Sequence, residues 1–260
     1  MRRLWLGFLC WLCWGCASAQ PQPTLPEGLQ ALRNAQVTVT VGSRTSQSQQ
    51  TLPYLWDRQQ PGQSGSARFE VGFSLPKTAE VPYGAYFLRL GNTYEVWLNG
   101  VLLQRKGDLQ GLDGADYAKV PRYVAIPAAL LHQDNLLSIR IHADVGRRGG
   151  LAPIILGPEA VVMAHFVTEA VMVDLGTYLL LLFGSISALL LLPLWLTQTE
   201  PVPGRPGLVR GDRLYLYAAM AEMVFLLRLG NNVIERPPLP WAWWNALNGV
   251  SLGGWVFLRC

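Results

Sequence analysis

The sequence predicts an exported all-β sandwich domain followed by α-helices that cross a membrane. Between residues 36 and 156, short runs alternate apolar with polar residues and are separated by Gly, Pro, Asn and Asp, as is typical of strands joined by turns. Residues 175–196 carry no charged side chain over a length that can span a bilayer. The chain is 50% hydrophobic and 15% charged, which excludes a disordered chain and argues against a purely cytosolic enzyme. The net charge of +4 forms no basic face with interleaved aromatics, so we expect no nucleic-acid partner.

The first 19 residues have the pattern of a secretory signal peptide. Two arginines precede an apolar run over residues 4–16, and an A-x-A site predicts cleavage between Ala19 and Gln20. A lipoprotein signal ending at Cys16 is the alternative, but the two residues that precede Cys16 by three and two positions do not fit a lipobox. The C-x-x-C-x-x-C spacing lies inside this apolar run, so we expect no metal site there and no disulfide framework in the exported domain.

The predicted sandwich covers residues 36–160, after an N-terminal lead over residues 20–35. Four runs are predicted as strands of this domain: residues 36–41, 68–75, 86–90 and 137–142. Asn99-Gly100 lies between apolar flanks and predicts a tight type I′ hairpin. Residues 45–65, rich in Gln, Ser and Gly, are predicted to form a loop anchored by one aromatic side chain.

Polar and aromatic residues on the predicted loops and strand ends are the candidates for ligand binding. They are Trp56, Asp57, Arg89, Asp116, Asp144, Arg147 and Arg148. Trp56 either stacks on a sugar ring or plugs the end of the sandwich, and the plug is favoured because Trp is mostly buried. Arg147-Arg148 either clamps a carboxylate or an acidic sugar, or is a basic turn that contacts headgroups or solvent, and the second is favoured. Arg89 lies in an apolar run and needs a partner if it is buried, either a ligand or an internal carboxylate.

No catalytic, metal or cofactor site is expected. The histidines His132, His142 and His165 have no metal-ligand spacing, and no nucleophile elbow or phosphate loop is present. Asp113 and Asp116 belong to an ordinary polar loop, without the setting that would raise the pKa of one carboxyl. An exported carbohydrate-active enzyme is the competing class, and it would need two carboxylates in a cleft.

Three membrane spans are predicted after the sandwich. They cover residues 175–196, 214–230 and 241–260, with a cytoplasmic loop over residues 197–213 and an outer loop over residues 231–240. The arginines of the 197–213 loop agree with the positive-inside rule, and the signal peptide independently places the sandwich outside. Glu222 lies inside the second span and should face other helices, because a carboxylate in lipid is costly.

Two resemblances follow from the order of the motifs. The pieces that carry the first are Pro53, Trp56, residues 67–69, residues 86–91, residues 96–100, residues 126–131 and residues 135–137. Their order resembles galactose-binding-like jelly rolls, such as the N-terminal domains of β-galactosidases and β-glucuronidases. The run into the membrane over residues 150–158 and the entry over residues 211–218 are similar to bacterial seven-transmembrane receptors with diverse intracellular signalling modules.

The second resemblance implies a function. In such receptors a periplasmic domain takes the signal, and a cytoplasmic GGDEF diguanylate cyclase or histidine kinase gives the output; here only three spans and no effector signature occur. We therefore expect the sensory input part of a multi-pass receptor of the bacterial inner membrane, with the effector missing. The ligand would be a periplasmic small molecule, with carbohydrate-like molecules among the candidates, or a partner protein, and a homodimer is one possible arrangement. The alternative is an envelope carbohydrate- or partner-binding membrane protein without signalling output.

Overall fold

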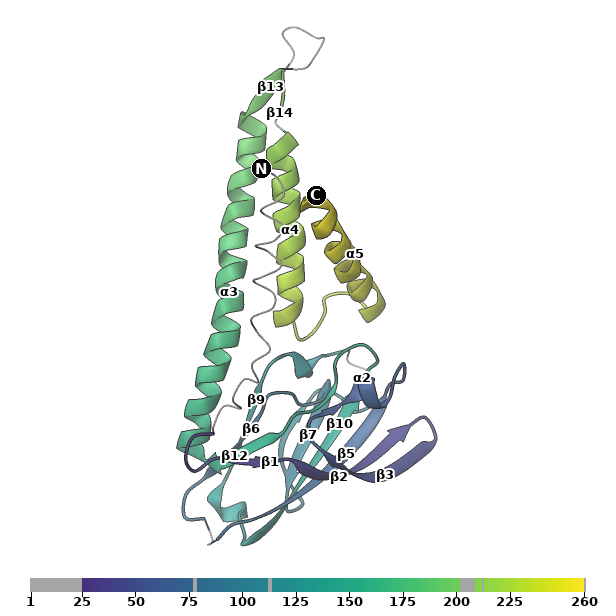
Figure 1. Ribbon diagram of the computed structural model, residues 1–260, viewed down its shortest axis with the longest axis vertical. Helices are drawn as coiled ribbons and strands as arrows, with labels where there is room; N and C mark the ends of the chain where they lie inside the picture. The colour runs from purple at the N-terminus through teal and green to yellow at the C-terminus, as the bar shows by residue number, and fades with distance from the viewer. Residues whose placement is uncertain (1–24, 77–78, 112–113, 202–208, 212, 260) are drawn as a thin grey trace, which may run out of the picture.

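The structure, a computed structural model, describes residues 25–259 apart from residues 77–78, 112–113, 202–208 and 212. The predicted signal peptide and its cleavage site between Ala19 and Gln20 lie outside the described residues. Figure 1 shows β1 to β12 gathered into one body and β13 and β14 at the far end of the helices, beyond α3 (Glu159–Thr197) and α4 (Arg213–Val233).

The strands form a sandwich of two antiparallel sheets, which confirms the predicted β-sandwich. The larger sheet has the order β3-β2-β5-β10-β7-β8, the smaller has β1-β12-β6-β9, and β4 pairs with β11. The bounds are β1 (Gln30–Leu32), β2 (Asn34–Val41), β3 (Arg44–Thr51), β4 (Tyr54–Leu55), β5 (Gly65–Ser74), β6 (Tyr83–Phe87), β7 (Thr93–Leu98), β8 (Val101–Lys106), β9 (Arg122–Ile126), β10 (Asp134–Ala143), β11 (Gly150–Leu151) and β12 (Ile154–Pro158).

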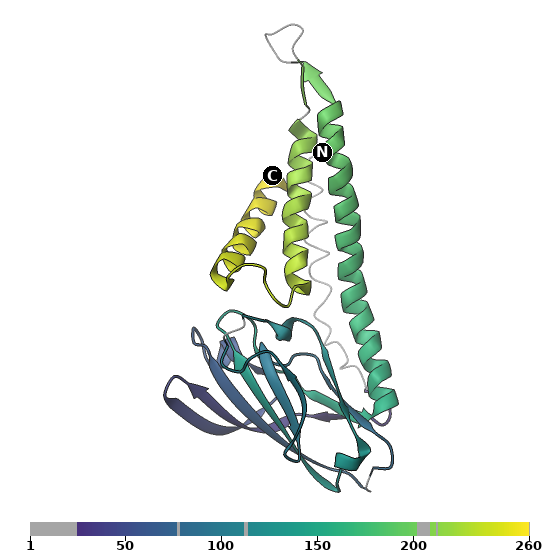
Figure 2. The ribbon, with the colours of Figure 1, turned by 180° about the vertical axis from the view of Figure 1, so that it is seen from behind.

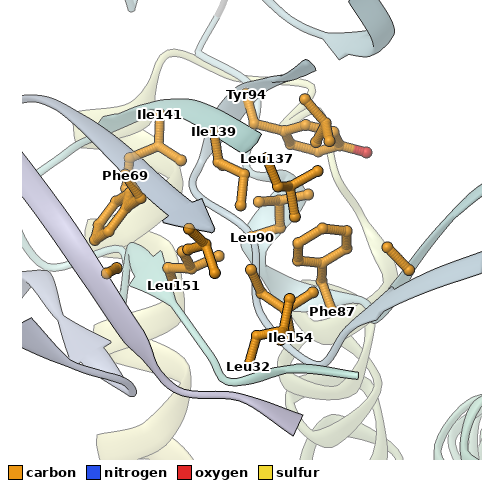
Figure 3. Close-up of a cluster of buried hydrophobic side chains, with 14 of the residues drawn as sticks. Leu32, Phe69, Phe87, Leu90, Tyr94, Leu137, Ile139, Ile141, Leu151 and Ile154 are labelled. Carbon is orange, nitrogen blue, oxygen red and sulfur yellow. The ribbon is translucent and has the colours of Figure 1, made fainter. Parts of the chain in front are cut away.

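The core lies between the two sheets (Figure 3). Four side chains that are 0% exposed form one row across the larger sheet: Val37, Phe69, Ile139 and Val96. On the smaller sheet Phe87 pairs with Ile154, and both are also 0% exposed. Each fully buried side chain of this kind stabilises the fold by about 1.5–3 kcal/mol, so the alternation seen in the sequence is what closes the sandwich.

The Asn99-Gly100 hairpin is confirmed. It joins β7 to β8, and both residues have positive φ, 50° and 86°. The Asn99 side chain also donates a hydrogen bond to Leu130 O at 2.9 Å and accepts one from Leu136 N at 2.9 Å. The residue therefore sets the turn and ties it to the neighbouring loop and strand.

Two local predictions are wrong. Residues 45–65 are not a loop, because β3 covers Arg44–Thr51 and the short helix α2 covers Trp56–Gln59. The β3 strand is an edge strand that is exposed on both faces, so its backbone pairs with β2 while its sequence shows no apolar alternation. The strand predicted over residues 86–90 ends at Phe87, and Arg89 follows in a loop.

The long helix α3 covers Glu159–Thr197, so it begins 16 residues before the predicted span at residue 175. It starts directly after Pro158, the last residue of β12, and no linker separates the sheet from the helix. Its 39 residues correspond to about 58 Å, nearly twice the thickness of a hydrocarbon core of about 30 Å. The first part of α3 therefore belongs with the sandwich.

That first part packs on the smaller sheet through aromatic side chains. Tyr123 donates a hydrogen bond to Glu159 Oε1 at 3.1 Å, and the ring of Phe166 lies 5.9 Å from that of Tyr123. The rings of His165 and Phe166 lie 5.2 and 6.1 Å from that of Tyr86. The α3 helix is thus fixed to the domain along its side as well as at its first residue.

The elements described after α3 are two helices and a short strand pair. The α4 helix covers Arg213–Val233 and α5 covers Trp241–Arg259, close to the predicted second and third spans. The predicted loop over residues 197–213 contains β13 (Thr199–Pro201) paired with β14 (Val209–Gly211). Among the described residues, α3 is the one helix with the length and composition to cross a membrane. A multi-pass arrangement therefore stays a prediction.

The α4 helix packs along α3, and the two helices approach each other closely at Gly184 of α3. A Cβ atom on Gly184 of α3 would lie 2.9 Å from Leu226 Cδ2 and 3.5 Å from Glu222 Oε2. Glu222 is therefore on the side of α4 that faces α3. The absence of a side chain at Gly184 lets the two helices approach each other at this level.

Candidate functional site

A pocket of about 380 Å³ lies where the sandwich meets the helices. Three sandwich segments line it together with α3, α4 and α5, and its lining is mostly polar and charged. The lining residues are Arg89, Asp116, Ala118, Lys119, Val120, Gly146, Arg147, Arg148, Thr177, Arg228, Asn231, Asn232, Val233, Trp244, Asn245 and Asn248. Ligand pockets commonly have about 300–1,000 Å³, so this one fits a small polar molecule.

Asn92 organises the sandwich side of the pocket. Its side chain is 0% exposed and donates hydrogen bonds to Asp116 Oδ1 at 2.7 Å and Arg147 O at 3.2 Å. Its Oδ1 accepts a hydrogen bond from Asp144 N at 2.9 Å, and its backbone oxygen accepts one from Tyr117 N at 2.8 Å. One buried amide therefore holds three loops together, which fixes the positions of the charged residues that they carry.

Arg147 lines the pocket but its charge is used inside the fold. Its guanidinium donates to Gly114 O at 3.0 Å and Ala115 O at 3.1 Å and pairs with Asp144 at 2.9 Å. Burial opposes ionisation of Asp144, but the hydrogen bond with His142 and the charge of Arg147 lower the pKa of Asp144 below its ordinary value. Arg147 and Asp144 therefore support the loop, and a clamp formed by both arginines, the less favoured of the two interpretations, stays a prediction.

Arg148 is held at the rim by Asp57. Asp57 Oδ1 accepts a hydrogen bond from Gly146 N at 2.9 Å, and Oδ2 accepts one from Arg148 N at 3.1 Å. Arg148 adopts a φ of 56°, a left-handed conformation that is unusual for a residue with a side chain. Gly150, two residues after Arg148, is required by space, because a Cβ there would collide with Tyr54 O. Asp57 thus supports the loop and Arg148 faces the pocket.

Arg89 and Asp116 lie on the sandwich side as well. Burial and the nearby Arg148 lower the pKa of the Arg89 guanidinium, although the charges of Asp116 and Asp57 oppose this shift. Burial raises the pKa of Asp116, against the hydrogen bond from Asn92 and the charge of Lys119. No described residue pairs directly with the Arg89 guanidinium, so the expectation of a ligand or an internal carboxylate as its partner stays a prediction.

The helix side contributes amides and an indole. Lys119 Nζ donates to Ile234 O at 3.0 Å and lies 3.4 Å from Asn231 Oδ1, which also accepts a hydrogen bond from Trp244 Nε1 at 2.8 Å. Asn248 donates to Trp244 O at 2.9 Å, while its buried Oδ1 accepts no hydrogen bond from the described residues. The wall formed by α4 and α5 therefore offers hydrogen-bonding groups to a bound molecule.

Trp56 lies inside the fold. Its indole is 0% exposed, lies among the buried core residues, and donates a hydrogen bond to Gln63 O at 2.7 Å. Burial leaves no ring face for a sugar, so the plug interpretation describes its position. Four of the seven predicted residues line the pocket. Asp57 and Asp144 bind the loop that carries Arg147 and Arg148.

Sequence reasoning did not find the residues that complete the pocket. Lys119, Arg228 and the asparagines of α4 and α5 lie up to 159 positions from Arg89 in the chain, so no local pattern connects them. A cation near the end of an apolar run at Arg228 and the pair Asn231-Asn232 were the available signals. No group of three or more His, Cys, Asp or Glu side chains suited to a metal ion occurs in the part of the chain that the structure describes.

Comparisons with known proteins find a structural likeness for about half of the chain. No protein-family model matches, and no curated protein matches. About half of the chain matches β-sandwich domains of β-glucuronidases. An FMN-binding β-glucuronidase from Faecalibacterium prausnitzii is 16% identical, with 49% of this chain and 22% of that chain covered and a TM-score of 0.37. The β-glucuronidase of Ruminococcus gnavus is 12% identical, with coverages of 53% and 30% and a TM-score of 0.40.

These likenesses concern the sandwich and not the activity. A second β-glucuronidase from Faecalibacterium prausnitzii is 14% identical, with 54% of this chain and 33% of that chain covered and a TM-score of 0.38. The chain spans a third or less of the length of each of these three proteins. Function has to be argued from the pocket itself.

Proposed function

We propose that this chain is the sensory input part of a membrane signalling receptor, in which a ligand binds between the sandwich and the helices. The observation that carries the proposal is the pocket itself, because its lining comes from three sandwich segments and from α3, α4 and α5. A molecule bound there contacts the sandwich and the helices at once. It therefore favours one arrangement of sandwich and helices over others by the difference in its affinity for them.

The direct connection between β12 and α3 supports this coupling. Pro158 ends the strand, Glu159 begins the helix, and Tyr86 and Tyr123 pack against the first turns of α3. A movement of the sandwich is therefore passed to the helix that has the length and composition to cross a membrane. A flexible linker between domains would absorb such a movement instead.

A second connection joins the sandwich to the segment between α4 and α5, which lies next to the sandwich in both views (Figure 1, Figure 2). We call it the loop contact and define it by Asp116, Lys119, Arg122, Ile234 and Glu235. Arg122 pairs with Glu235, Asp116 N donates to Glu235 O at 2.8 Å, and Lys119 Nζ donates to Ile234 O at 3.0 Å. Asp116 and Lys119 also line the pocket, so a ligand would act directly on this contact.

The finer parts of the proposal rest on the sequence. The sandwich is proposed to be a galactose-binding-like jelly roll on the periplasmic side, and α4 and α5 are proposed to cross the bacterial inner membrane together with α3. Full-length relatives of the receptor type would carry a diguanylate cyclase or, next in order, a histidine kinase. This chain would supply their input, and its ligand would be a small periplasmic molecule.

Distance measurements on the full chain in lipid nanodiscs test the coupling. Spin labels are placed on Gln47→Cys in β3 and Leu196→Cys near the far end of α3, with the 4 native cysteines replaced by serine. Both positions are exposed and lie outside the pocket. Citrate, inorganic phosphate, glucuronate and glucose serve as probes. A saturable change in the distance distribution with any of them is expected; a probe that binds in the pocket without changing the distances would overturn the proposal.

A further inference from the structure

We propose that the pocket binds an anionic group, a phosphate or a carboxylate, held between Arg89 and Arg148 of the sandwich and Arg228 of α4. The inference rests on the proposed function and names the chemistry of its ligand. The shared chemistry is an oxyanion on a small molecule, either a soluble compound or the headgroup of an anionic lipid.

The charge balance of the lining is the first argument. Five cationic side chains and one carboxylate line the pocket. Two of the cations have partners inside the fold, since Arg147 pairs with Asp144 at 2.9 Å and Lys119 lies 3.8 Å from Asp116. Arg89, Arg148 and Arg228 form no side-chain ion pair or hydrogen bond with the described residues. A surplus of arginine charge in a concave site attracts an oxyanion.

The mutual position of Arg89 and Arg148 is the second argument. Arg89 is partly buried, and both its burial and the charge of Arg148 act against its charged form. Arginine nevertheless stays protonated at neutral pH, so the two guanidinium groups repel each other across the site. A bound oxyanion reverses this repulsion, because each guanidinium can donate two parallel hydrogen bonds to it.

The conformation of Arg148 is the third argument. A φ of 56° disfavours any residue with a Cβ, and glycine occupies the positions on both sides of the Arg147-Arg148 pair. Asp57 holds this backbone through two N–H groups. A cationic side chain kept in an unfavourable backbone conformation by its surroundings fits a binding role better than a role in stability.

Arg228 extends the proposed site from the sandwich to the helix α4. It lies near the end of α4, one turn before Asn231 and Asn232, which also line the pocket. An anion held by Arg89, Arg148 and Arg228 together would pull α4 toward the sandwich. The site therefore gives a small ionic ligand direct influence on the loop contact.

Binding is tested on the full chain in nanodiscs of phosphatidylcholine, by thermal unfolding and by titration with inorganic phosphate, citrate and glucuronate. Glucose is the uncharged counterpart of glucuronate. We expect saturable stabilisation by at least one anion and none by glucose. Parallel nanodiscs that contain phosphatidylglycerol separate the two sources: stabilisation by this lipid without a soluble anion identifies a headgroup, and stabilisation by a soluble anion in phosphatidylcholine identifies a soluble ligand.

Three variants locate the site: Arg89→Gln, Arg148→Gly and Arg228→Gln. Each is expected to weaken anion binding about tenfold or more, because each removes a charged hydrogen-bond donor. Arg148→Gly should keep or raise the unfolding temperature, since it relieves the positive φ, so a loss of binding there is not a loss of fold. Arg44→Gln, on the exposed strand β3, is the matched control and should bind as the parent does.

The outcomes separate the two proposals. Absence of stabilisation by every anion and by phosphatidylglycerol overturns the anion site, as does equal weakening by Arg44→Gln and the pocket variants. Anion binding that leaves the label distance between positions 47 and 196 unchanged supports the site and overturns the coupling. A distance change with glucose and with no anion overturns the site and supports the coupling.

Discussion

The position of Trp56 bears on the two interpretations of this residue, a sugar-stacking surface or a plug at the end of the sandwich. Its indole is 0% exposed and its Nε1–H is bonded to Gln63 O at 2.7 Å. We expect Trp56→Ala to destabilise the sandwich by about 3–5 kcal/mol, the usual cost of deleting a buried large aromatic. Trp56→Phe keeps most of the volume and should cost clearly less. Chemical denaturation of the full chain measures both, and an unfolding midpoint unchanged by Trp56→Ala would contradict the buried position.

Asp144 gives the domain a defined dependence on pH. Burial opposes its ionisation, but His142 and Arg147 outweigh burial and hold its pKa below 3.8 in the folded state. The folded state therefore binds fewer protons than the unfolded state, so the stabilisation is fully present above pH 3.8 and is lost as the pH falls through the lower folded value. We expect Asp144→Asn to cost about 1–3 kcal/mol at pH 7, as loss of a charged hydrogen bond does.

The pH profile of unfolding checks this expectation. The difference in stability between the parent chain and Asp144→Asn should shrink as the pH falls below 3.8. Glu80→Gln, a change at an exposed carboxyl, is the control and should follow the parent at every pH. A difference that stays constant down to acid pH would mean that the Asp144 carboxylate is not what holds the loop.

At the scale of elements, the loop contact is the testable junction. Arg122 and Glu235 form an ion pair whose side chains are 15% and 32% exposed. We expect Arg122→Gln and Glu235→Gln each to weaken the association of the sandwich with the α4–α5 segment. A double-mutant cycle should give a coupling energy of about 0.5–3 kcal/mol, because the two residues touch.

Crosslinking provides a direct measurement of that association. A cysteine pair placed across the loop contact should form a disulfide more slowly in either single variant than in the parent. Arg105→Gln breaks a pair between β8 and Glu95 of β7, outside the loop contact, and is the matched control. Equal crosslinking in all variants would show that the ion pair does not hold the two elements together.

The elements differ in how far the sequence predicts them. The sequence predicts β2, β5 and β10 through their alternation, because a strand with one buried face has an apolar residue at every second position. The Asn99-Gly100 turn predicts the hairpin of β7 and β8. The edge strand β3 cannot be predicted from alternation, because neither of its faces is buried. The start of α3 at Glu159 cannot be predicted because its first turns, up to Phe166, pack on the smaller sheet, and their apolar positions resemble neither a span nor a strand.

At the scale of the whole molecule, the pocket is the part that sequence cannot predict. Arg89, Asp116 and Arg148 could be named as candidates, but Arg147 could not be told from them, since only the fold shows that its guanidinium faces Gly114 O and Ala115 O. Arg228 reaches the site through the packing of α4 on the sandwich. A site assembled from six separate segments leaves no spacing to recognise.

The direct connection of β12 to α3 leads to a prediction for the intact chain. Insertion of Gly-Ser-Gly-Ser between Pro158 and Glu159 should broaden the distance distribution between labels at positions 47 and 196 and remove its response to bound probes. The same insertion between Gly42 and Ser43, in the turn between β2 and β3, should leave that response intact. Short insertions in exposed turns cost little stability, so the variant in the β2–β3 turn should fold as the parent does. An undiminished response after the first insertion would show that the helix is moved by another route.

The length of α3 has a mechanical consequence. A straight helix of about 58 Å that is fixed at its first turns acts as a lever, and a tilt of one degree at the fixed end swings the far end by about 1 Å. In the proposed receptor, a rotation of the sandwich by a few degrees would displace the opposite end of α3 by a distance comparable to an atomic diameter. A small rotation of the sandwich would thus become a larger displacement of the far end of α3, and no part of the chain would have to unfold.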